Sequence, residues 1–173
     1  MISDKMAAAL NNQINKEIFS AYLYLGMSSY AFSKGLSGMA NWFSVQVKEE
    51  LTHAQKFFDY LNHQGAKVSL FAVDAPDQKF SSPADLFKKT IEHEKKVTAL
   101  INELSFLANA EKDRATDIFL QWFVTEQVEE EAAALDIYQK LNLVGDNGHG
   151  ILLIDGELAK RTFIQTAATV SLT

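Results

Sequence analysis

The sequence contains no cysteine, only 2 prolines and only 8 glycines. Without thiols the chain cannot form disulfides, thiolate zinc sites, iron–sulfur clusters or a cysteine nucleophile. Pro76 and Pro83 lie close together, so the rest of the chain is free of proline and favours long helices. The scarcity of proline and glycine also excludes collagen-like and linker-rich architectures.

Basic residues and long apolar runs are also scarce. Lys and Arg number 16 against 22 Asp and Glu, giving a net charge of -6, which disfavours nucleic acid as a partner and suits the binding of cations. No apolar run is long enough to span a membrane, and the first residues, MISDKMAAALNNQ, lack the apolar stretch of a signal peptide. We therefore expect a soluble cytoplasmic protein with no membrane partner, whose 173 residues form a single domain.

Breaks in the apolar pattern divide the chain into five predicted helices. They cover residues 4–33, 38–64, 83–110, 113–141 and, as a short fifth helix, about 147–163. The motif Ser82-Pro83-Ala84-Asp85 predicts the start of the third helix, because it combines an N-cap, an N1 proline and an acidic first turn. The stretch 65–82 is long enough to cross the whole bundle, which would leave the second and third helices parallel.

The predicted fold class is therefore all-α, a four-helix bundle with a long crossover between helices two and three and a short fifth C-terminal helix. The domain is expected to cover residues 1–163, with residues 164–173 as a disordered tail.

Each apolar stripe of the four long helices is interrupted near its middle by one polar residue. These residues are Glu17, Glu50, Glu94 and Gln127. The separation from Glu17 to Glu50 is 33 residues, and the same separation leads from Glu94 to Gln127. Because the middles of packed helices share one layer, the four groups are expected to meet at one point. Three residues after the second member of each pair stand His53 and Glu130, on the same helix face.

Buried carboxylates cost free energy unless they are paired or bind a metal. No Lys or Arg lies on these stripes at this level, whereas two Fe²⁺ ions would balance the charges of Glu17, Glu50, Glu94 and Glu130. Oxygen-rich ligation with one imidazole suits iron or manganese. A single Glu-x-x-His motif is weak support for a metal site, and a lone Glu in a core stripe usually reaches water with its carboxylate. Four polar residues at matched depth on four helices, in contrast, favour a metal centre.

Three segments around these residues resemble the non-haem bacterial ferritins: NKEIFSAYLYLGMSSY, VKEELTHAQKFFDYL and FLQWFVTEQVEEE. The resemblance covers about residues 1–163 and implies a ferroxidase centre with two iron ions per subunit. Its residues would be Glu17, Glu50, His53, Glu94, Gln127 and Glu130. It also implies iron storage, in which Fe²⁺ is oxidised by O₂ or peroxide and stored as ferric oxyhydroxide in a shell of 24 subunits with octahedral symmetry. The segment ILLIDGELAKRTFI resembles the helix that lines the fourfold axes of that shell.

The resemblance assigns two further features. Tyr24 matches a tyrosine that family members keep beside the centre, although a core tyrosine is an equally good interpretation. Glu49, Glu126, Glu129 and Glu130 match a third iron site on the cavity side, although runs of charge usually form solvated helix faces.

Departures from related families narrow the prediction. A bacterioferritin would carry a second Glu-x-x-His where this chain has Gln127 and Glu130, and a haem-ligating methionine where it has Leu51, so we expect no haem. Gln127 is a neutral oxygen donor, and weaker ligation suits iron in transit. Two other functions stay open: a di-iron oxygenase or peroxidase acting on an organic substrate, and a metal-free helical adaptor with apolar residues expected at the Glu positions.

Overall fold

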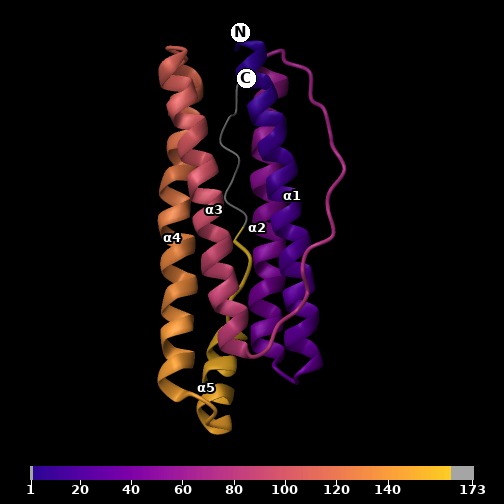
Figure 1. Ribbon diagram of the computed structural model, residues 1–173, viewed down its shortest axis with the longest axis vertical. Coiled ribbons are helices and arrows are strands. Elements are labelled where there is room, and N and C mark those ends of the chain that lie inside the picture. Colours follow the sequence, from indigo (N-terminus) through magenta and orange to yellow (C-terminus); the bar gives the residue numbers. More distant parts are fainter. Residues whose placement is uncertain (1, 165–173) are drawn as a thin grey trace.

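A computed structural model of the protein describes residues 2–164, and these residues form five α-helices and no strand (Figure 1). The helices are α1 (Asp4–Ser33), α2 (Ser37–His63), α3 (Pro83–Ala110), α4 (Arg114–Val144) and α5 (Gly148–Leu158). The four long helices lie side by side, and α5 lies at one end of the bundle. The predicted all-α four-helix bundle with a short fifth helix is confirmed.

The connections give the bundle its parallel and antiparallel pairs. Helix α1 packs mainly on α2, and α3 on α4, each pair being antiparallel. The segment between α2 and α3 has no regular secondary structure and runs alongside α1 from one end of the bundle to the other (Figure 1). This crossover is fastened to α1 by Asn11, which donates to the Lys67 carbonyl at 3.1 Å, and by Asn15, which donates to the Ala72 carbonyl at 3.0 Å. The predicted parallel arrangement of α2 and α3 follows.

Three of the four long helices are capped by their own flanking side chains. Ser82 accepts the backbone N–H of Asp85 at 3.0 Å, with Pro83 in the first turn, as the motif predicted. Ser3 and Asp113 cap α1 and α4 in the same way. Helix α2 has no such cap of its own. Its first orphan N–H groups therefore need an acceptor from elsewhere.

That acceptor comes from α5. The Asp155 carboxylate accepts the N–H of Gly38 at 3.0 Å and the N–H of Met39 at 2.7 Å. The two helices approach so closely that a Cβ added to Gly38 would lie 1.7 Å from the Asp155 carbonyl oxygen. Glycine at position 38 thus permits the contact by which α5 is docked onto the bundle.

Two predicted helix ends differ from the structure by three residues or more, and the others by at most one. Helix α4 continues to Val144 instead of stopping at 141, and it ends where Gly145 takes a positive φ of 55°. Helix α5 ends at Leu158 instead of about 163. Beyond it the side-chain amide of Asn41 donates to the carbonyls of Leu158 (3.3 Å) and Arg161 (2.9 Å). These hydrogen bonds from α2 satisfy carbonyl groups that would otherwise accept from the backbone N–H groups of a longer α5. Of the predicted tail, residues 165–173 lie outside the described residues.

The hydrophobic core consists of two clusters that lie toward opposite ends of the bundle. One contains Met27, Phe43 and Phe87 together with α5 residues, and the other contains Leu10, Phe57 and Phe123. The buried polar residues of the sequence prediction occupy the helical turns between the two clusters. Among residues 2–164, no helix combines the length and apolar character that crossing a bilayer requires.

Candidate metal centre

Each long helix contributes at least one buried polar side chain to the middle of the bundle. Glu17 comes from α1, Glu50 and His53 from α2, Glu94 from α3, and Gln127 and Glu130 from α4. Glu17, Glu50 and Glu94 are each only 1% exposed. The two carboxylate oxygens of Glu130 are also shielded from solvent. The predicted convergence of these residues is therefore present in the structure.

The donor atoms form two adjacent groups that share one carboxylate. Glu17, Glu50 and His53 place their donor atoms within 4.8 Å of one another, and so do Glu50, Glu94 and Glu130. Because Glu50 belongs to both groups, it lies where a carboxylate would bridge two neighbouring cations. His53 Nδ1 lies 3.5 Å from Glu50 Oε2. An arrangement of this kind, with carboxylates and a Glu-x-x-His from several helices, is typical of di-iron bundles.

Several of these oxygens have no hydrogen-bond partner among the described residues. They are one oxygen each of Glu17 and Glu50 and both oxygens of Glu130. Buried acceptors without partners are rare in proteins because each costs about 1–3 kcal/mol. Two cations bound between the helices, one in each donor group, would satisfy all four atoms. The donor set, hard oxygens and one imidazole, suits iron or manganese.

The electrostatics of the site point the same way. Burial raises the pKa of Glu17, and it raises the pKa of Glu50 and of Glu130 well above the ordinary value, with the neighbouring carboxylates adding to the effect for the latter two. Like charges crowded in a low-dielectric space disfavour ionisation. A site that destabilises its own negative charge binds positive charge well.

Further side chains hold these donors in place. Gln13, one turn before Glu17, donates its side-chain amide to Glu17 Oε1 at 2.8 Å. Gln127 Nε2 donates to Glu94 Oε2 at 3.1 Å. In this geometry Gln127 contacts the site as a hydrogen-bond donor to a carboxylate rather than as an oxygen donor. Gln13 was missed by the sequence prediction, although its spacing of four residues from Glu17 places both on one face.

Tyr24 lies at the boundary between the site and one of the two hydrophobic clusters. It is fully buried, its hydroxyl donates to Glu94 Oε1, and its ring stacks against Phe43 with centroids 5.9 Å apart. Burial, together with the charges of Glu94 and Glu50, raises the pKa of Tyr24 well above its ordinary value. The hydroxyl therefore stays protonated and orients Glu94.

The structure brings together only part of the predicted third site. His53, Glu126 and Glu130 place donor atoms within 4.8 Å of one another. Glu129 is exposed and belongs to none of the donor groups found among the described residues. Glu49 is engaged elsewhere: its Oε2 accepts from Arg161 Nη2 at 2.5 Å. No sequence pattern indicates this ion pair, because it depends on how the chain reverses after α5.

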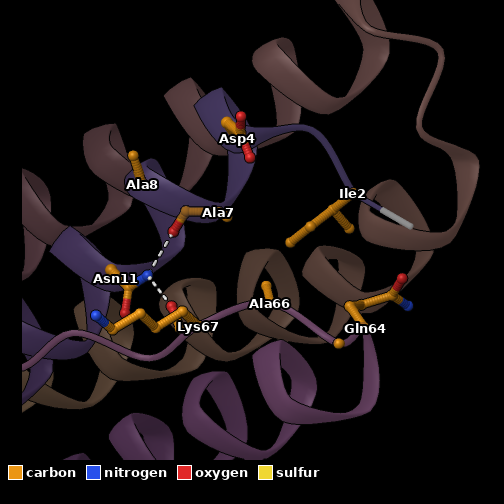
Figure 2. Close-up of a pocket in the computed structure, with 9 residues that line it drawn as sticks. Ile2, Asp4, Ala7, Ala8, Asn11, Gln64, Ala66 and Lys67 are labelled. Carbon is orange, nitrogen blue, oxygen red and sulfur yellow. Dashed lines mark hydrogen bonds between the residues drawn. The ribbon is translucent and has the colours of Figure 1, made fainter.

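A cavity of about 480 Å³ lies away from these residues, at the end of the bundle where α1 begins. Figure 2 shows it between the first turns of α1 and the chain that leaves α2, with Asn11 bonded to the carbonyls of Ala7 and Lys67. Asn11, the α1 residue of the lining nearest to Glu17, still lies about 9 Å from it along the helix axis, at 1.5 Å per residue, and none of the carboxylates of the cluster lines the cavity. The cavity therefore does not belong to the carboxylate cluster.

The fold and the donor set are those of the carboxylate-rich four-helix bundles that bind pairs of metal ions. The sequence model of the ferritin-like domain family matches residues 7–144. The chain belongs to the ferritin family.

Individual relatives agree with this placement. A bacterial non-haem ferritin of Staphylococcus aureus (strain MRSA252) is 41% identical over 163 residues, which cover 94% of this chain and 98% of that protein. A probable bacterial non-haem ferritin-like protein of Haemophilus influenzae is 41% identical over 158 residues, covering 91% of this chain and 96% of the relative. Among solved structures, an engineered closed form of the Archaeoglobus fulgidus ferritin is 52% identical, with a TM-score of 0.94, 95% of this chain and 100% of that chain being covered. An open-pore ferritin of the same archaeon gives a TM-score of 0.93 at 52% identity, covering 94% and 100%.

Proposed function

We propose that this protein is a cytoplasmic iron-storage ferritin. Its centre would bind two Fe²⁺ per subunit as substrate and oxidise them with O₂ or peroxide, and the ferric product would be stored as oxyhydroxide in a shell of 24 identical subunits. The observation that carries the proposal is the buried carboxylate cluster with its unpartnered oxygens. The family membership and the relatives named as non-haem ferritins support it.

The residues present have distinct roles in this proposal. Glu17, Glu50 and His53 would hold one iron, and Glu50, Glu94 and Glu130 the other, so that Glu50 bridges the pair. Four carboxylates balance the charge of two Fe²⁺. Hard carboxylate oxygens favour Fe³⁺ over Fe²⁺, which helps oxidation. Each Fe²⁺ loses one electron, and the two electrons reduce the oxidant with uptake of protons from solvent.

Three neighbouring side chains would position the carboxylates without coordinating iron directly: Gln13, Tyr24 and Gln127. Each donates a hydrogen bond to Glu17 or Glu94. Such bonds fix the direction of a ligand oxygen and tune its affinity for the metal. The proposal includes no haem, in agreement with Leu51 at the position where a haem-ligating methionine would stand.

The decisive experiment is an anaerobic Fe²⁺ titration of the metal-free protein followed by exposure to air. We expect saturation at two Fe²⁺ per subunit, then rapid oxidation and, on repeated addition, a soluble mineral-filled particle. Analytical ultracentrifugation of the same sample is expected to show a 24-subunit particle. Failure to bind Fe²⁺, or a particle no larger than a dimer, would refute the storage function.

A further inference from the structure

Arg161 binds the bundle through three kinds of contact. Its Nη2 forms an ion pair with Glu49 Oε2 at 2.5 Å, its Nη1 donates to the Trp42 carbonyl at 3.3 Å, and its guanidinium lies 4.5 Å from the centre of the Trp42 ring. The backbone is held too, because the Asn41 amide donates to the Arg161 carbonyl. Only about a quarter of the Arg161 side chain is exposed. A long side chain fixed at so many points occupies a defined position.

The position of Arg161 is significant because its partner, Glu49, lies next to the metal centre. Glu49 directly precedes Glu50 on α2, and it is close enough to His53 and Glu126 for both charges to act on its pKa, which burial raises. His53 and Glu126 form the third donor group with Glu130. Glu49 would be the natural further carboxylate for a cation in that group, but its Oε2 is paired with a guanidinium.

We propose that Arg161 acts as a tethered cation beside the centre, so that a third metal ion binds at Glu126 and Glu130, next to His53, with the help of Glu49 only when Arg161 releases Glu49. The inference rests on the proposed iron centre and concerns the regulation of that same site. While Arg161 stays paired, a third ion gains one carboxylate fewer and is repelled by a nearby positive charge. The centre is thereby held at two ions, and the third position fills only transiently.

The positive charge that competes with a metal ion for Glu49 comes from Arg161, in the segment that follows α5. Arg161 lies three residues beyond the end of α5, in chain that doubles back along α2. Because α5 is itself docked by Asp155 on the start of α2, the placement of Arg161 depends on that docking. The C-terminal segment thus contributes directly to the number of cations that the centre holds.

The test uses Zn²⁺ as a redox-inert probe and isothermal titration of the chelator-treated, assembled protein. The variant is Arg161→Gln, and the matched control is Lys160→Gln, which removes the same charge from the exposed neighbouring residue. We expect two tight Zn²⁺ per chain in the wild type and a weaker third. In Arg161→Gln the third ion should bind at least about tenfold more tightly, as changes beside a metal site commonly alter affinity by this factor. Lys160→Gln should match the wild type.

A double variant tests whether Glu49 is responsible for the tighter binding of the third Zn²⁺ ion. If Glu49 is the carboxylate that Arg161 releases, Arg161→Gln with Glu49→Gln should lose the tighter third ion. Arg161→Met, which keeps an unbranched side chain over Trp42 without the charge, answers the same question should Arg161→Gln not assemble. An unchanged third affinity in both Arg161 variants, or an equal gain in Lys160→Gln, overturns the inference while leaving the two-ion centre in place. A wild type that binds no Zn²⁺ pair overturns the proposed function and the inference with it.

Discussion

Replacing Glu50 by Gln should stabilise the metal-free protein. Glu50 is 1% exposed, belongs to both donor groups, and leaves one oxygen without a partner. Its burial and the charges of Glu94 and Glu17 raise its pKa well above the ordinary value. An amide of the same shape removes the buried charge. We expect the free energy of unfolding at neutral pH to rise by about 1–3 kcal/mol, because the neutral amide avoids burying a charge and its N–H₂ can donate to an unpartnered carboxylate oxygen nearby.

The raised pKa of Glu50 also predicts how the stability of the metal-free protein changes with pH. A carboxyl group with a raised pKa in the folded state keeps a proton that the unfolded chain releases. The contribution of Glu50 to folding stability is therefore complete below the ordinary pKa of 4.5, and it is lost as the pH rises through the folded-state pKa. The metal-free wild type should therefore lose stability as the pH rises from mildly acidic to neutral. Glu50→Gln should show a shallower decline.

Urea unfolding followed by circular dichroism, in buffers with a chelator and at one protein concentration, measures both quantities. Glu103→Gln is the matched control, because Glu103 is exposed on α3 and the same charge is removed there without burial. Zn²⁺ should then stabilise the wild type more than Glu50→Gln, since it binds only the folded site. Equal stability and equal pH slopes in wild type and Glu50→Gln would refute the assignment of strain to this carboxylate.

Three further predictions follow. His53→Ala should abolish rapid Fe²⁺ oxidation in stopped-flow absorbance while circular dichroism stays unchanged; an unchanged initial rate removes His53 from the centre. Gln127→Glu replaces the donor to Glu94 with an acceptor and should slow the first oxidation phase; a normal first phase with a stalled second addition would instead favour a role in iron transit. Asp155→Ala uncaps α2 and should cost about 1–2 kcal/mol and expose α5 to protease, whereas exposed Glu157→Ala should do neither; equal protease sensitivity would contradict the docking argument.

The fold could be predicted because its determinants are local. Helical periodicity, the Ser82–Pro83 start signal and the length of the crossover are properties of contiguous sequence, and each agrees with the structure. The end of α5 could not be predicted in this way. It is set by Asn41, which lies more than a hundred residues earlier and competes for the carbonyls of the last turn.

The candidate centre was predictable for a similar reason. Glu17, Glu50 and Glu94 each lie near the middle of their helix, which placed them at one depth, and a polar residue in an apolar stripe is visible in the sequence. The bond from Gln127 to Glu94 and the pairing of Arg161 with Glu49 depend on side-chain rotamers and on a reversal of the chain. Composition and spacing carry no information about either.

The division of the core into two hydrophobic clusters has a mechanical consequence. Each cluster holds one end of the four helices together by close packing, whereas the waist between them contains carboxylates that repel one another when no metal is bound. In the proposed function, iron that enters the waist would replace this repulsion with attraction and so join the two halves. The stiffness of each chain would then vary with its iron content, so that a loaded chain would differ from an empty one in rigidity even where its helices have not moved.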